Sequence, residues 1–123
     1  MKFLAKFEPL AFTALRVVAG FLFSCHGAQK LFGAFGGPQM LHQPLMLAAG
    51  IIEFGCGILI LLGLGTRIAA LLASGEMAVA YFMMHQPKGL FPIQNHGELA
   101  VVYCFLFLFI ATHGAGKFGM DKG

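Results

Sequence analysis

The chain has 123 residues, of which 59% are apolar and only 11% are charged, and its formal net charge is +3. Its mean hydropathy is +0.83. Soluble domains carry about 25% charged residues, so this composition excludes a water-soluble enzyme and a disordered chain. The basic residues are scattered along the chain, which also excludes nucleic-acid binding. We therefore expect a single membrane domain over residues 1–123.

Four apolar stretches are each suited to crossing the bilayer core, which is about 30 Å thick, as a helix. In chain order they cover residues 10–31, 45–64, 67–86 and 98–113. None of them alternates apolar and polar residues, which excludes the strands of a membrane β-barrel. Helices satisfy their own backbone groups in lipid, so we expect an all-α, integral membrane four-helix bundle.

The connections between these spans differ in length and charge. Residues 63–66 form a tight turn, whereas the loops at about 32–44 and 87–97 are longer and hold four of the five prolines. Five basic residues lie on the side of the tight turn, namely Lys2, Lys6, Arg67, Lys117 and Lys122, against Lys30 and Lys88 on the other side. The positive-inside rule then places both termini in the cytoplasm, in a prokaryotic inner membrane. We look for function on the outer half, where the longer loops lie.

Charged residues inside the spans are the most informative feature of the sequence. Each costs at least about 2.5–3.5 kcal/mol on insertion scales, so such residues persist where they are paired or line a polar cavity. Arg16, Glu53 and Glu76 each share a helix face with glycine or alanine residues. Small residues allow helices to approach closely, so these faces are expected to point into the bundle.

Depth along the spans suggests which of these charges meet. A rise of 1.5 Å per residue from the inner boundary places Arg16 at about 9 Å, Glu76 at about 13 Å and Glu53 at about 18 Å. We therefore predict a structural ion pair between Arg16 and Glu76, which either fixes helix register alone or also serves function. Glu53 lies higher and lacks an equally close cation, which makes it the stronger candidate for proton exchange with a ligand.

A polar cluster is expected near the outer surface. His26, Gln29, Lys30 and Glu98 are candidates there for ligand binding, and His85 and His96 lie at a similar depth. Histidines and carboxylates can bind metals. However, the sequence has no H-x-x-x-H pair, and His85 lies about 180° from Glu76 on an ideal helix. We therefore expect no metal site.

Four motifs in order resemble the DoxX family of small four-span membrane proteins. The first span is similar to the family's R-x3-G-x5-H-G-x-Q-K-L-F-G opening, which begins here at Arg16. The other matches are Gly50-x-x-Glu53-x-x-x-Gly57 with Gly63 and Thr66-Arg67, Gly97-Glu98, and Gly114-Ala-Gly-Lys117-Phe-Gly-Met-Asp121. The terminal motif departs from the family's G-P-G-R-x-S-L-D, because Ala115 replaces the proline and Gly119 the serine.

This resemblance implies an accessory subunit associated with a redox membrane complex. The family includes subunits linked to quinone-dependent thiosulfate oxidation, so a quinone is the cofactor that the resemblance implies. The expected partners are the lipid bilayer together with other membrane or redox subunits or further copies of this chain. The sequence carries no haem, flavin, iron–sulfur or nicotinamide motif, so we expect no intrinsic cofactor.

Two other functions remain open at this stage, because a fold does not determine a reaction. One is a non-enzymatic scaffold subunit of a larger membrane complex. The other is a small proton-coupled transporter in which Glu53 and Glu76 relay protons. The sequence does not decide whether the protein is an enzyme.

Overall fold

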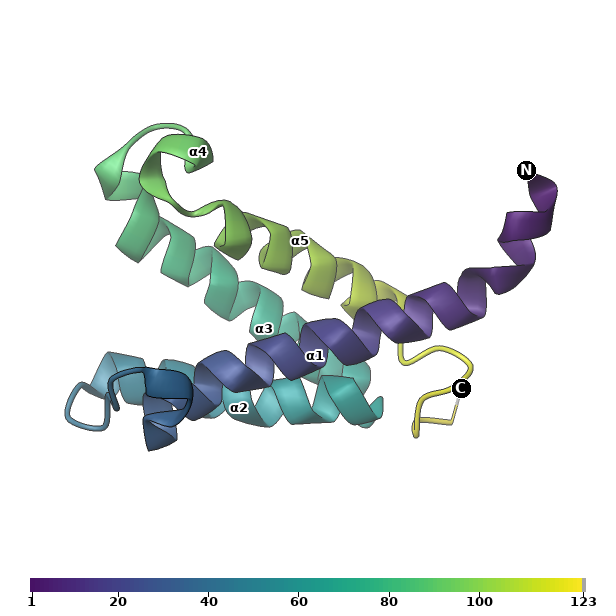
Figure 1. The fold of residues 1–123 in the computed structure, drawn as a ribbon, viewed down its shortest axis with the longest axis horizontal. Coiled ribbons are helices and arrows are strands. Elements are labelled where there is room, and N and C mark those ends of the chain that lie inside the picture. Colours follow the sequence, from purple (N-terminus) through teal and green to yellow (C-terminus); the bar gives the residue numbers. More distant parts are fainter. Residues whose placement is uncertain (123) are drawn as a thin grey trace.

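The computed structural model describes residues 1–122, and within them every regular element is helical (Figure 1). The main helices are α1 (Glu8–Phe32), α2 (Pro44–Leu62), α3 (Thr66–Ala80) and α5 (Glu98–His113). The shorter elements are η1 (Lys2–Phe7), η2 (Ala34–Gly36), η3 (Tyr81–His85), η4 (Gln86–Lys88) and α4 (Pro92–Asn95). This arrangement confirms the predicted all-α bundle.

Three of the helical segments are long and apolar enough to cross a membrane, namely Lys2–Phe32, Pro44–Leu62 and Thr66–Lys88. The fourth predicted span coincides with α5, which is apolar but has only 16 residues. At 1.5 Å per residue it is about 24 Å long, somewhat less than the bilayer core. The loop that contains α4 lies beyond the N-terminal end of α5 (Figure 1).

The main helices form two pairs, in which α1 packs along α2 and α3 packs along α5 (Figure 1). Glycine allows the backbones of the first pair to come very close. A Cβ atom on Gly20 would lie 2.6 Å from the Leu61 nitrogen, and one on Gly57 would lie 2.6 Å from the Ser24 nitrogen. Close backbone approach at small residues is how helices gain packing energy in lipid.

An aromatic layer joins the two pairs near the middle of the molecule. The rings of Phe23 on α1 and Phe107 on α5 have centroids 4.7 Å apart, and both residues are fully buried. Tyr103 stacks on Phe107 with centroids 5.3 Å apart. Beyond this layer the two pairs diverge toward the end that carries α4 (Figure 1). The polar residues of the outer half lie in this diverging region.

The opposite end is closed by the tight turn and the C-terminal tail. Gly63 and Gly65 have φ angles of 70° and 58°, which glycine adopts without strain. The Asp121 carboxylate accepts hydrogen bonds from the Gly65 and Thr66 nitrogens at 2.8 and 3.0 Å, at the start of α3. These two backbone bonds hold the pKa of Asp121 below its ordinary value. The predicted turn at 63–66 is thus present, and its hydrogen bonds to Asp121 of the tail stabilise it.

Two arginines complete this end by binding the carbonyl groups at helix C-termini. Arg16 donates from Nη1 to the Ile60 and Leu61 carbonyl oxygens at 2.7 and 2.8 Å, at the end of α2. Arg67 donates to the Ala111 and Thr112 carbonyl oxygens at 3.1 and 2.6 Å, at the end of α5. The last carbonyls of a helix have no partner within the helix and carry partial negative charge, so a guanidinium suits them.

The predicted ion pair between Arg16 and Glu76 is therefore wrong. Arg16 is buried, and its hydrogen bonds go to α2 carbonyl oxygens rather than to a carboxylate. Within residues 1–122, neither ion pair that the structure contains involves Arg16 or Glu76. The C-terminus of α2 lies closer to Arg16 than Glu76 does, and its free carbonyls compete successfully for the guanidinium.

Candidate ligand pocket

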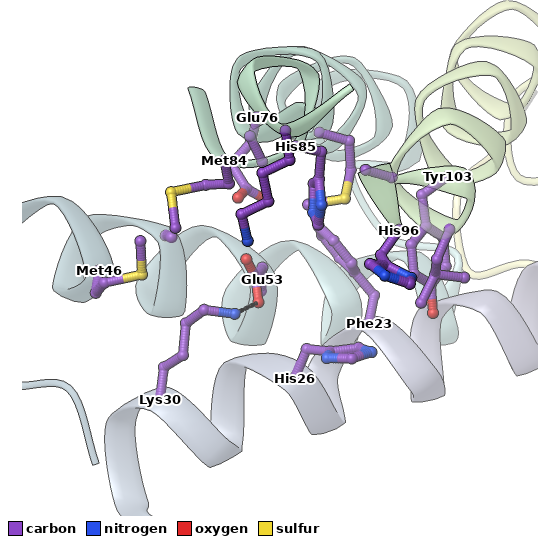
Figure 2. Close-up of a pocket in the computed structure, with 16 residues that line it drawn as sticks. Phe23, His26, Lys30, Met46, Glu53, Glu76, Met84, His85, His96 and Tyr103 are labelled. Carbon is purple, nitrogen blue, oxygen red and sulfur yellow. Dashed lines mark hydrogen bonds and ion pairs between the residues drawn. The ribbon is translucent and has the colours of Figure 1, made fainter. Parts of the chain in front are cut away.

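A pocket of about 350 Å³ lies where the two helix pairs diverge (Figure 2). Each of the four main helices contributes to its wall, together with the segment that follows α3. Its lining residues are Phe23, His26, Lys30, Met46, Ala49, Glu53, Glu76, Met77, Ala80, Met84, His85, Lys88, His96, Leu99, Ala100 and Tyr103. Lys88 and His96 are exposed, so the pocket reaches the protein surface.

An ion pair between α1 and α2 forms one wall of the pocket. The Lys30 Nζ atom donates to Glu53 Oε1 at 2.7 Å (Figure 2). The Glu53 side chain is only 3% exposed, whereas that of Lys30 is 23% exposed. The prediction that Glu53 lacks a close cation is therefore wrong. Depth counting compares backbone positions, but the four-carbon stem of lysine lets its ammonium group reach a carboxylate several ångströms away.

Among the described residues, Glu76 is the pocket carboxyl that has no cation in ion-pair contact. It projects from α3 into the same pocket that Glu53 enters from α2 (Figure 2). Its Oε1 atom is buried and accepts no hydrogen bond from the described residues, and the Glu53 carboxyl group lies close to the Glu76 side chain. A buried polar atom without a partner costs about 1–3 kcal/mol, which is a common sign of a site that binds something else. Glu76, rather than Glu53, is therefore the carboxyl group without a close cation.

A π-helical turn explains why His85 reaches the pocket. On an ideal α-helix His85 would point away from Glu76, yet both residues line this pocket. The chain from Tyr81 to His85 is π-helical. Each residue of a π-helix turns by less than the 100° of an α-helix, so His85 is displaced from its ideal position onto the pocket side. Single π turns inside helices occur frequently at functional sites.

Asn95 holds the outer loop over this end of the bundle. It is fully buried, and its Nδ2 atom donates to the Tyr81 hydroxyl and the Gly89 carbonyl, both at 3.0 Å. Its backbone carbonyl lies 3.2 Å from Nδ1 of His85. A carbonyl can only accept, so this contact requires the Nδ1–H tautomer and leaves Nε2 as the acceptor nitrogen.

His96 follows Asn95 directly and has a φ angle of 61°. A left-handed conformation is uncommon for residues other than glycine, and it persists only where the surrounding structure imposes it. Here the fully bonded Asn95 side chain also accepts from the Gly97 nitrogen at 2.8 Å, which fixes the chain on both sides of His96. The strained turn places the His96 side chain on the pocket (Figure 2).

The structure divides the ligand-binding candidates into two groups. His26, Lys30 and Glu53 line the pocket, whereas Gln29 and Glu98 are absent from its lining. Gln29 lies against Gly37 of the outer loop, and Glu98 is exposed in the first turn of α5. An acidic residue is favourable at that position because a helix N-terminus carries partial positive charge.

Sequence reasoning missed several residues of the pocket wall. Tyr103 lies four residues before Phe107, and this spacing indicates a buried stripe on α5. Lys88 was assigned only to the outer loop, and nothing in the local sequence indicates that it reaches the pocket. Among residues 1–122, no three His, Cys, Asp or Glu side chains are grouped so that they could hold a metal ion.

Fold and site together define an all-α integral membrane protein with a polar pocket between two helix pairs. The DoxX family model matches residues 11–86, and the chain belongs to this family. An uncharacterized protein of Haemophilus influenzae is 42% identical over 99% of this chain and 96% of its own length. The inner membrane protein YqjF of Escherichia coli is 28% identical over 95% of this chain and 94% of its own length. No solved structure matches the chain.

Proposed function

We propose that this DoxX protein is an accessory subunit of a redox complex in the inner membrane and binds a quinone-like molecule in the pocket. The observation that carries the proposal is the unpartnered Glu76 Oε1 atom beside the Lys30–Glu53 ion pair, in one pocket. The inner-membrane location is supported by the relative YqjF, which is an inner membrane protein. The redox association is supported by the resemblance of the sequence motifs to those of the family.

The residues of the pocket suit a small ring with polar oxygen atoms. Its volume of about 350 Å³ falls near the lower end of ligand pockets, which span about 300–1,000 Å³. Phe23, Met77 and Tyr103 provide apolar surface, while Lys88, His26 and His96 offer hydrogen-bond donors to carbonyl oxygens. A bound quinone would supply electron transfer coupled to proton uptake.

Glu76 is the residue that we assign to proton exchange. Glu53 is already held by the Lys30 ammonium group, whereas Glu76 has no cation in ion-pair contact among residues 1–122. A carboxyl group that no ammonium group holds is free to take up a proton and to pass it on. Glu76 can therefore donate a hydrogen bond to a ligand oxygen while it is protonated.

The quinone content of the purified protein tests this proposal. Wild type and Glu76→Leu would be extracted in a mild detergent, and quinone per chain would be measured by chromatography. We expect about one quinone per chain in wild type and about fivefold less in Glu76→Leu, the effect of one hydrogen bond of about 1 kcal/mol. Glu98→Leu, outside the pocket, is the matched control and should retain quinone.

Other outcomes of this experiment favour the competing functions. Quinone-free wild type in a stable larger complex would contradict the proposal and support the scaffold. The transporter is disfavoured by the aromatic layer, because Phe23, which lines the pocket, and Phe107 are fully buried and pack against each other between the helix pairs. Subunits that copurify with wild type, identified by mass spectrometry, would show whether the complex contains redox proteins.

A further inference from the structure

A second cavity of about 460 Å³ lies between α2 and α3. Its lining is apolar except for Glu76, the one ionisable residue that it contains within the described chain. The lining residues are Leu45, Met46, Ala48, Ala49, Ile52, Leu71, Leu72, Gly75, Glu76, Val79, Ala80, Met83 and Met84. Leu71, Leu72 and Val79 are more than half exposed and lie within a membrane-spanning segment, so this apolar groove opens toward lipid.

The apolar groove is continuous with the polar pocket. Met46, Ala49, Glu76, Ala80 and Met84 line both cavities. Two of these residues are alanines, and the two methionines have flexible, unbranched side chains that adapt to different occupants. The helices that flank the opening, α2 and α3, contact each other much less extensively than α1 and α2 do.

Glu76 lies at the junction of the two cavities, and its buried Oε1 atom has no partner among the described residues. A bare hydrocarbon chain in the groove would leave this oxygen without a hydrogen bond. A water-soluble ligand in the pocket would leave the apolar groove unfilled. A molecule that satisfies both cavities needs a hydrogen-bonding head and an apolar chain.

We propose that the apolar groove holds the chain of an amphiphile whose polar head occupies the pocket, and that this ligand enters sideways from the bilayer between α2 and α3. This inference rests on the proposed function only in taking the pocket as the site of the head. It adds the class of ligand, an amphiphile of the lipid phase, and the direction of entry. The chain lies against the apolar residues of α2 and α3, and the head hydrogen-bonds to Glu76.

Glycine residues provide a variant that fills the groove and a matched control. A Cβ atom on Gly75 would meet nothing within 4 Å, and Gly75 lines the groove but not the pocket. Gly75→Leu therefore fills the groove without a clash in the helix packing. Gly55 also has open space around its Cβ position, but it lines neither cavity. Gly55→Leu makes the same chemical change elsewhere on the lipid-facing surface.

The test compares two probes on wild type, Gly75→Leu and Gly55→Leu in detergent. The probes are decylubiquinone and its chain-free dimethoxy-methyl-benzoquinone head. Because leucine would obstruct only the chain, we expect decylubiquinone to bind Gly75→Leu at least about tenfold more weakly than wild type, a loss of about 1.4 kcal/mol. The chain-free head should bind all three proteins within about twofold, and Gly55→Leu should match wild type with both probes.

The outcomes separate this inference from the proposed function. If decylubiquinone binds all three proteins equally well, the groove does not hold the chain, although quinone binding itself stands. If neither quinone binds wild type, the proposed function fails, and spin-labelled stearic acid then tests the groove independently. Immobilised label in wild type and Gly55→Leu but not in Gly75→Leu would support the inference, and equal spectra for the three proteins would overturn it.

Discussion

The two carboxyl groups that line the pocket have different surroundings although their sequence contexts are alike. Both Glu53 and Glu76 lie beside small residues within apolar helices, but only Glu53 is bound by an ammonium group. The difference arises from Lys30, whose long side chain bridges from α1 to α2. Because Lys30 binds Glu53, Glu76 is the carboxyl group that remains available to a ligand.

A double-mutant cycle on Lys30 and Glu53 measures this bridge. Lys30→Met leaves a buried carboxylate without its partner, so we expect the free energy of unfolding to fall by roughly 1–3 kcal/mol. Adding Glu53→Leu removes the unpaired charge and should restore much of that loss, with a coupling of about 1–3 kcal/mol. Reversible unfolding in mixed micelles gives the four free energies.

The same cycle on Arg16 and Glu76 is the matched comparison. Arg16 binds α2 carbonyl oxygens and shares no hydrogen-bond partner with Glu76. Arg16→Met and Glu76→Leu should therefore act additively, to within about 0.5 kcal/mol. Coupling above about 1 kcal/mol for this pair, or none for Lys30 and Glu53, would show that the ion pairing differs from that in the structure.

At this scale the sequence predicts which residues approach the site but not how they pair. Helical phase and small neighbours indicate correctly that Glu53 and Glu76 face the interior, and both line the pocket. Pairing depends on side-chain reach and on competing backbone carbonyls. Arg16 was assigned to a carboxylate because depth counting considers charges and ignores the free carbonyls at the end of α2.

At the scale of the elements, the helices follow the predicted boundaries closely. Most of the main helices begin and end within a few residues of the predicted spans, because glycine and proline mark their ends clearly. The exception is α3, which ends at Ala80, although the span predicted there runs to residue 86. The π-helical turn from Tyr81 to His85 was not predicted. Nothing in its sequence distinguishes it from an α-helix, and it becomes favourable only through the packing of the outer loop, including the contact of His85 with Asn95.

The C-terminal tail is attached to the tight turn and the start of α3 through Asp121, and this attachment depends on pH. The pKa of Asp121 is lowered in the folded protein by the hydrogen bonds from Gly65 and Thr66. Its stabilising contribution is therefore complete above the ordinary aspartate pKa of about 3.9 and is lost as the pH falls through the lower folded value. We expect Asp121→Asn to melt at a lower temperature than wild type at neutral pH.

Thermal melts in detergent from pH 7 down to about pH 2.5 test this linkage. The difference between wild type and Asp121→Asn should stay constant down to about pH 4 and shrink below it, as the wild-type carboxylate takes up a proton. Lys122→Gln changes the charge of the same tail without introducing a group that titrates in acid. A wild-type advantage that persists unchanged at the lowest pH would show that the Asp121 charge is not what holds the tail.

At the scale of the whole molecule, the two ends have different roles. One end is closed by the tight turn, the tail and the two arginine caps, and the other holds the pocket and the outer loops (Figure 1). The N-terminus and the C-terminal tail as far as Lys122 lie toward the closed end (Figure 1). The side of the membrane that the pocket faces therefore follows from the side on which the closed end lies.

Charge predicts that the closed end faces the cytoplasm. Lys2, Lys6, Lys117 and Lys122 flank the ends of the chain, and Arg67 begins α3 beside the tight turn, whereas Lys88 lies at the pocket end. Basic residues next to membrane spans remain on the cytoplasmic side. The Asp121 contact with the turn requires the tail and residues 63–66 to lie on the same side of the membrane.

Reporter fusions test this orientation and, with it, the side to which the pocket opens. Alkaline phosphatase, which is active only outside the cytoplasm, should be inactive after Lys122 and active when inserted within residues 34–42. Green fluorescent protein should show the opposite pattern, and Gly55→Leu can serve as a neutral background control. The inverse result would place the pocket on the cytoplasmic side. The same side for both positions would contradict the odd number of membrane spans between them, which are α2, the segment that begins with α3, and α5.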